Sequence, residues 1–198
     1  MPIELSSDLP TPLIPLAWLI GKWAGAGVVG YPTIEEARFG QEIEFSHDGR
    51  PFLSYRSQTW LLDDDGNQTR PLATEVGFWR PVAATVGHAD EADETDETKG
   101  TNGTDGTSDE NASAPSVGTE LEVLLAHPTG FVEIYLGTVT GPRIDLATDL
   151  VARTATAKEY TAASRLYGLV ESDLLWAMDM AAMGQPLQSH ASARLKRM

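Results

Sequence analysis

The chain has 198 residues and no cysteine, which excludes several kinds of site. Without cysteine there is no disulfide, no thiolate ligand for zinc or an iron–sulfur cluster, and no cysteine nucleophile. Basic residues are also scarce, because 14 Lys and Arg oppose 29 Asp and Glu, for a formal net charge of −15. Phosphate contacts need clustered Lys and Arg, so this composition argues against nucleic-acid partners and against anionic membrane surfaces.

Long apolar runs and targeting signals are missing as well. The most apolar stretch near the N-terminus, residues 13–20, is too short to span a bilayer. Residues 1–10 are acidic and contain proline, and they lack the basic start of a secretory signal. The sequence therefore predicts a cytoplasmic protein without a membrane partner.

Acidic side chains are concentrated in one segment. Between His88 and Gly118, nine acidic residues oppose one basic residue, Lys99, so 9 − 1 gives −8 of the total charge. This segment has no aromatic residue, and its apolar surface is too small to offset the entropy lost on ordering. We expect a disordered acidic insert at about residues 83–118, acting as a solvated loop extension or as an interaction segment. It would interrupt a single domain at 12–198, preceded by an N-terminal extension at 1–11.

The rest of the chain has the alternation of half-buried β-strands. Phe39, Gln41 and Ile43 alternate with Gly40 and Glu42, which is the period of a strand with one face in a core. Ten strands are predicted in this way, at 24–31, 38–46, 52–62, 72–81, 120–126, 131–139, 143–152, 158–170, 174–181 and 187–197.

Short turns between these strands indicate an antiparallel meander. Examples are His47-Asp48-Gly49 and Thr140-Gly141-Pro142, which carry typical turn residues. Ten strands must close on themselves or leave exposed edges. The prediction is an all-β fold, a ten-stranded up-and-down β-barrel of the fatty-acid-binding or lipocalin type that can hold a small ligand. A short helix at residues 12–19 would close one end.

Catalytic motifs are lacking, which leaves the four histidines as candidates. The chain has no G-x-S-x-G elbow and no H-E-x-x-H motif. His47 and His127 lie next to turn residues and His88 begins the acidic insert, so all three are predicted to be solvated or turn residues. His190 differs, because it lies in a strand-like run with small neighbours. The pattern alone favours a structural histidine over a metal ligand, since one histidine makes no zinc site, although a single histidine suffices as the axial ligand of a haem.

Glycine alternates around a tryptophan near the start of the first strand. Gly21, Trp23, Gly25 and Gly27 form the pattern G-x-W-x-G-x-G. Glycine at alternate positions suits a tightly curved strand and a close backbone approach. We interpret the motif as a barrel corner whose tryptophan fills one end, which is compatible with any ligand.

These motifs, taken in order, resemble the nitrobindin family. The matching segments are GKWAGAG (21–27), YPT (31–33), GRPFLSY (49–55), EVGF (75–78), AHPTG (126–130), TAKE (156–159) and MAAMGQPL (180–187) followed by His190. The Gly/Trp motif alone is shared with lipocalins and fatty-acid-binding proteins, whereas the full set in this order is specific. The similarity covers nearly all of the chain outside the acidic insert and the N-terminal residues.

The resemblance implies a barrel that binds one haem b per subunit at one end. It implies that His190 is the axial iron ligand and that Thr33 lies beside the haem. It places Lys158 near a haem propionate. Met180 either lines the haem pocket or is an ordinary core methionine.

The resemblance also implies an activity, the isomerisation of peroxynitrite to nitrate at ferric haem, together with binding of NO. The protein would be a monomer or a homodimer. The alternative is a non-catalytic carrier of haem, fatty acid or another apolar ligand, which the barrel and the Gly/Trp motif predict equally well. His190 discriminates between them, because a lipid carrier does not need it.

Overall fold

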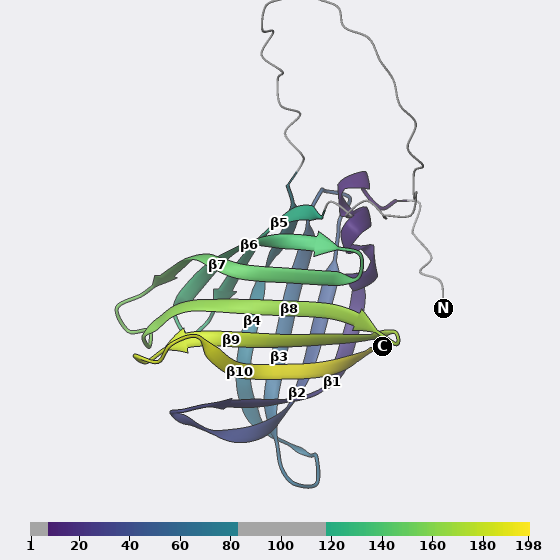
Figure 1. The fold of residues 1–198 in the computed structure, drawn as a ribbon. Coiled ribbons are helices and arrows are strands. Elements are labelled where there is room, and N and C mark those ends of the chain that lie inside the picture. The colour runs from purple at the N-terminus through teal and green to yellow at the C-terminus, as the bar shows by residue number, and fades with distance from the viewer. Residues whose placement is uncertain (1–7, 83–117) are drawn as a thin grey trace, which may run out of the picture.

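The computed structural model describes residues 8–82 and 118–198, and it contains a closed antiparallel β-barrel. The strands follow the order β1-β10-β9-β8-β7-β6-β5-β4-β3-β2, so consecutive strands are neighbours all the way round (Figure 1). The predicted all-β, ten-stranded up-and-down barrel is thereby confirmed. The predicted acidic insert and most of the N-terminal extension lie outside the described residues.

The strand bounds agree best with the prediction where buried and exposed residues alternate along the strand. The strands are β1 (Gly21–Tyr31), β2 (Ile34–Ser46), β3 (Leu53–Leu62), β4 (Gln68–Pro81), β5 (Thr119–His127), β6 (Phe131–Thr140), β7 (Arg143–Arg153), β8 (Tyr160–Val170), β9 (Asp173–Ala182) and β10 (Gln188–Arg197). The largest differences are the starts of β2 and β4, each four residues earlier than predicted. Both starts are solvent-exposed on successive residues, so no buried period marks them.

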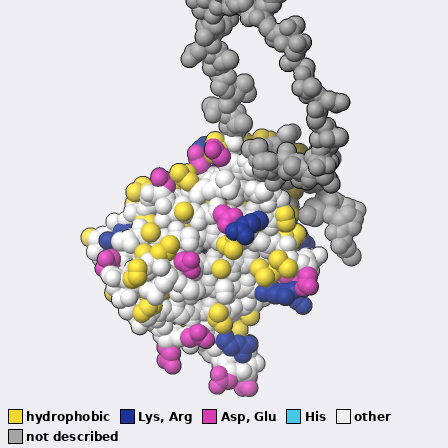
Figure 2. Space-filling view, viewed as in Figure 1, with side chains coloured by type: hydrophobic (Ala, Val, Ile, Leu, Met, Phe, Trp, Pro, Cys, Tyr) yellow, Lys and Arg dark blue, Asp and Glu magenta, His cyan; other side chains and the backbone are white. Residues whose placement is uncertain are grey.

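Alternation along each strand directs one set of side chains into the barrel. On β3, Leu53, Tyr55 and Ser57 are buried, whereas Arg56 and Gln58, which alternate with them, are exposed. Outward positions carry polar, charged and single apolar side chains, which are dispersed over the face seen in Figure 2. The inner set packs into one core that includes large aromatic side chains.

Pairing of β1 with β10 closes the barrel, and the Gly/Trp motif lies along this seam. A Cβ atom on Gly25 would lie 2.2 Å from the carbonyl oxygen of Arg194, and one on Gly27 would lie 2.2 Å from that of Ser192. Any side chain at these positions would therefore push the two strands apart. The motif thus serves closure, in agreement with its interpretation as a barrel corner.

The 3-10 helix η1 (Thr11–Leu19) covers one end of the barrel, as predicted for residues 12–19 (Figure 1). Leu13, Leu16 and Leu19 have no exposed surface. The indole Nε1 of Trp23 donates a hydrogen bond to the carbonyl oxygen of Leu19 at 2.7 Å, which fixes the helix to β1. In the part of the chain that the structure describes, no helix is long and apolar enough to cross a bilayer.

The hairpin turns β1–β2, β3–β4, β5–β6, β7–β8 and β9–β10 share the opposite end, because strand direction alternates in a meander. Figure 1 shows β3–β4 projecting at the bottom and the β7–β8 and β9–β10 connections at the left, away from η1. We call this end the mouth.

Candidate functional site

A cavity of about 520 Å³ occupies the interior of the barrel on the side of the mouth. This volume lies within the range of small-molecule sites. Apolar side chains form much of its wall, including Val29, Phe39, Leu61, Leu72, Trp176 and Met178. Polar lining residues are Gln41, Ser57, Thr59, Tyr55, Tyr167, Glu35, Glu36, Glu75, Arg70, Arg165 and His190.

His190 reaches the cavity from an irregular point in β10. Its neighbour Ser189 pairs with Asp179 of β9 and Ala191 pairs with Met178, so the register shifts at His190. Such a bulge re-aims a side chain relative to regular alternation, and bulges are common beside functional sites. His190 therefore lines the cavity, and β10 remains paired with β9 on both sides of the bulge.

The His190 ring is held in one tautomer. Its Nδ1 lies 3.0 Å from the carbonyl oxygen of Gly30, and a carbonyl only accepts, so Nδ1 carries the proton. The ring of Tyr31 meets the imidazole edge-on, with centroids 5.6 Å apart. Nε2 has no hydrogen-bond partner among residues 8–82 and 118–198, so its lone pair is available.

The surroundings of His190 also favour the neutral form of its imidazole. Burial lowers the pKa of its imidazole below the ordinary value; the Gly30 carbonyl opposes this effect in part, and the charge of Arg165 adds to it. A neutral imidazole with a free Nε2 and an oriented Nδ1–H is the form that ligates metals, with the backbone carbonyl as the outer partner.

The donor set fits a metal inside a prosthetic group better than a bare ion. No group of three or more His, Asp or Glu able to hold a metal ion occurs among the described residues. A haem brings four nitrogen ligands of its own and needs one protein ligand, which His190 can provide. The apolar wall formed by Val29, Phe39 and Leu72 suits a porphyrin face.

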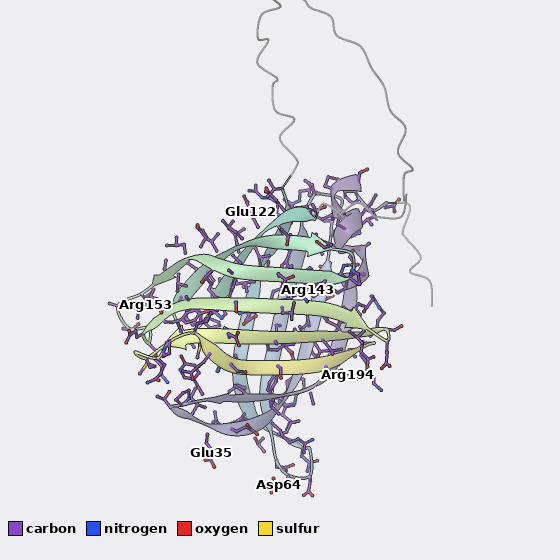
Figure 3. The ribbon with its side chains drawn as sticks, in the orientation of Figure 1. Glu35, Asp64, Glu122, Arg143, Arg153 and Arg194 are labelled. Carbon is purple, nitrogen blue, oxygen red and sulfur yellow. The ribbon has the colours of Figure 1, made fainter. Side chains whose placement is uncertain are left out.

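The other predicted site residues lie at or near the mouth but outside the cavity lining. Thr33 is exposed in the turn between β1 and β2, next to Ile34, which lines the cavity. Lys158 is exposed in the β7–β8 connection, where its carbonyl oxygen accepts a hydrogen bond from Arg153 at 2.9 Å. Figure 3 shows Arg153 at this end of the barrel.

Met180 is partly buried and packs against the core, whereas Met178, two residues earlier on β9, lines the cavity. The structure thus brings His190 and Met178 to the same cavity. None of the four motif residues Gly21, Trp23, Gly25 and Gly27 lines it.

A buried ionic cluster at the inner part of the cavity was not expected from the sequence. Arg165 is 4% exposed, and its Nη1 and Nη2 each lie 2.9 Å from one oxygen of Glu75, in a bidentate pair. Its Nη2 also lies 3.4 Å from Glu133, which is 1% exposed. Burial alone would raise the pKa of Glu75, but the charge and hydrogen bonds of Arg165 outweigh this effect and lower it to about 2.

His127 belongs to this cluster, so its prediction as a solvated turn residue is wrong. Its side chain is only 8% exposed, and its Nε2 lies 2.7 Å from Oε2 of Glu133. Its ring stacks on Phe131 with centroids 4.0 Å apart. His127 is the last residue of β5, and the alternation that buries Val123 and Leu125 also turns it inward.

The signal for the cluster was present in the strand patterns. Glu133 occupies the inward position between Phe131 and Tyr135, and Arg165 occupies the one between Ala163 and Tyr167. Opposite charges at inward positions of two strands indicate a buried pair, because neither can be buried alone. The hydroxyls of Tyr135 and Tyr160 both donate to Oε1 of Glu133 and complete its hydrogen bonding.

Comparison with known proteins agrees with this architecture. The family profile "THAP4-like, heme-binding beta-barrel domain" matches residues 12–197. The chain belongs to this haem-binding barrel family. The nitrobindin resemblance of the sequence motifs is confirmed, since a "Ferric nitrobindin-like protein" of Kineococcus radiotolerans is 52% identical over 202 residues, covering 100% of this chain and 99% of the relative.

Two further relatives of this nitrobindin-family chain extend the comparison. A "Peroxynitrite isomerase" of Leifsonia xyli subsp. xyli is 51% identical over 196 residues, covering 98% of each chain. The crystal structure of Rv2717c from M. tuberculosis is 34% identical with a TM-score of 0.70, covering 96% of this chain and 99% of that one. The similarity to these relatives therefore extends over nearly the whole sequence.

Proposed function

We propose that this protein binds one haem b per subunit through Nε2 of His190 and isomerises peroxynitrite to nitrate. The observation that carries the proposal is His190 itself, a half-buried imidazole on a bulge of the cavity wall. Its Nδ1 is fixed on the Gly30 carbonyl and its Nε2 is without a partner among the described residues. The name of the Leifsonia xyli relative, "Peroxynitrite isomerase", supports the same activity.

When bound, ferric haem supplies a Lewis-acidic iron with one open position for an anionic ligand such as peroxynitrite, and the ferrous form binds NO. The protein residues have simpler tasks. Gly30 and Tyr31 orient the His190 ring, and burial keeps the ring unprotonated. The apolar side chains of the cavity wall would exclude water from the faces of a bound haem. Isomerisation needs no general acid–base pair, so we assign no such role to the buried His127 and Glu133.

At the rim, we propose that Thr33 lies beside the haem edge and that the Lys158 ammonium approaches a propionate. Both side chains are exposed at the end of the barrel where the cavity opens. Met178 contributes apolar bulk to the pocket, and Met180 supports it from the adjacent core.

Titration of the purified protein with hemin tests this proposal. We expect a Soret band in the wild type that His190→Ala shifts and weakens, and that added imidazole restores. His47→Ala is the matched control, because His47 lies in an exposed turn where its Nδ1 accepts from the Gly49 amide. The haem-bound wild type should accelerate peroxynitrite decay and His190→Ala should not. An unchanged spectrum in His190→Ala excludes the ligand assignment, and decay equal to that in buffer excludes the enzyme.

A carrier of apolar ligands is the second candidate, favoured by the apolar wall of the cavity. Mass spectrometry of protein purified from cells separates the two candidates, because a carrier would retain lipid and tolerate His190→Ala. Haem at one per chain, lost in His190→Ala, excludes the lipid carrier.

A further inference from the structure

We propose that Arg70 forms an anion-binding position at the mouth, on the wall that faces His190; the inference rests on haem binding by His190. The anion is of carboxylate size. Its source is either a propionate of the haem or an anionic ligand on the open face of the iron. The experiment below distinguishes these two sources.

Strand pairing places the Arg70 side chain inside the mouth. Arg70 pairs directly with Leu61 of β3, and cross-strand partners project to the same face of a sheet. Leu61 lines the cavity, as does Arg70 itself. The residue is only two positions from the start of β4 at Gln68, so it lies at the rim rather than at the floor.

The strand order places Arg70 nearly opposite His190. β4 is the fourth strand from β10 in one direction round the barrel and the sixth strand from it in the other direction. The wall formed by β3 and β4 therefore lies across the cavity from the strand that carries His190. Leu61, Leu72 and Arg70 are contributed to the cavity by that wall. Arg70 is therefore the cation of the cavity wall across from His190, and an anion bound in the cavity between them would lie within reach of its guanidinium.

The charges of the lining make Arg70 different from Arg165. Arg165 is paired with Glu75 and Glu133, so its charge is already compensated. The guanidinium of Arg70 has no ion pair or hydrogen bond within the part of the chain that the structure describes. An exposed guanidinium beside an apolar cavity offers two parallel N–H donors to a carboxylate or another small anion.

Acidic residues on β2 place negative charge at the mouth, in addition to the positive charge of Arg70. Glu35 and Glu36 line the cavity close to the β1–β2 turn. Figure 3 shows Glu35 at the mouth end of the barrel, on β2. An anion in the mouth is repelled by Glu35 and attracted by Arg70, so replacing either residue should change its binding in opposite directions.

The test uses the full chain loaded with haem b or with the haem dimethyl ester, which lacks propionate charge. Variants are Arg70→Gln and Glu35→Gln, with Arg38→Gln as the matched control, since Arg38 is an exposed cation that does not line the cavity. The first readout is the rate of haem transfer to apomyoglobin. The second is the affinity of the ferric protein for azide, an anion, against imidazole, a neutral ligand. Thermal melting confirms that each variant is folded.

Two results support the proposal. If a propionate is the anion, Arg70→Gln speeds loss of haem b by about two- to fivefold and leaves loss of the dimethyl ester unchanged, as expected for an exposed ion pair. If the iron ligand is the anion, Arg70→Gln lowers the affinity for azide by a similar factor with both haems and leaves the affinity for imidazole unchanged. Glu35→Gln should act in the opposite sense in either case.

Two other results overturn it in distinguishable ways. Haem uptake by the wild type, with Arg70→Gln equal to Arg38→Gln in both readouts, refutes the Arg70 assignment and leaves the proposed function standing. A wild type that takes up no haem refutes the proposed function and the Arg70 assignment together.

Discussion

Nδ1 of His190 lies 3.0 Å from the carbonyl oxygen of Gly30, and this contact joins β10 to β1 at the mouth end of the seam that closes the barrel. The same pairing that completes the fold therefore fixes the tautomer of the candidate ligand. Closure and ligand orientation depend on one another, because Gly30 follows the last residue of β1 that pairs with β10, Val29.

His190 should make the stability of the apoprotein depend on pH. Burial lowers its pKa in the folded state, so below the unfolded value of 6.5 the unfolded chain binds more protons. Stability should therefore fall as the pH is lowered from 6.5 through the folded pKa. Urea midpoints between pH 8 and pH 5 should decline less in His190→Gln than in the wild type. Parallel curves for the two proteins would contradict the lowered pKa.

Arg165→Met should destabilise the protein strongly. The substitution leaves Glu75 and Glu133 without their shared cation in a buried setting, at a cost of about 3–5 kcal/mol. The matched control is Arg194→Met, which removes exposed ion pairs to Glu171 and Asp173 and should cost at most about 1 kcal/mol. Denaturant unfolding measures both. Equal losses in the two variants would show that the buried cluster contributes no more than a surface pair.

Glu75 should contribute stability that is lost in acid. Its pKa falls from 4.5 in the unfolded chain to about 2 in the folded protein, so its stabilisation is complete above pH 4.5. It disappears as the pH falls to about 2, and the full difference is on the order of 3 kcal/mol. Glu75→Gln should therefore be less stable than the wild type at pH 6 and should approach it near pH 2. A constant difference across this range would argue against the Arg165 pairing.

Gly25→Ala should weaken barrel closure, because its Cβ would lie 2.2 Å from the backbone oxygen of Arg194. A loss of about 1–3 kcal/mol is expected from such overpacking. Gly168→Ala is the matched control in β8, where the nearest atom, the Pro142 oxygen, would be 3.9 Å from the new Cβ. Thermal melting compares the two. A melting temperature of Gly25→Ala equal to that of Gly168→Ala would show that the seam can widen without cost.

Much of the fold is predictable from local pattern. The alternation of strands such as β3, with turns between them, is enough to indicate an antiparallel meander, and ten strands indicate closure. The starts of β2 and β4 escaped prediction because exposed strand ends have no buried face, and only pairing with a neighbour defines them.

The candidate site was predictable only in part. The sequence singled out His190 by its small neighbours and by its motif, and the structure places it in the cavity wall. The roles assigned to Thr33, Lys158 and Met180 stay proposals. His127 was misjudged because an adjacent Pro-Thr-Gly turn indicates exposure, whereas Glu133 on the neighbouring strand holds the ring inside.

By itself, then, the sequence determined the family, the strand content and the meander, and it singled out His190 as the proposed iron ligand. These depend on local period and on motifs, which the chain order contains. Only the tertiary structure decided which carboxylates are buried, that Gly30 orients His190, and that Arg70 faces it across the mouth. Those relationships join residues as far apart as Gly30 and His190, and closure of the barrel into one register is what brings them within contact distance.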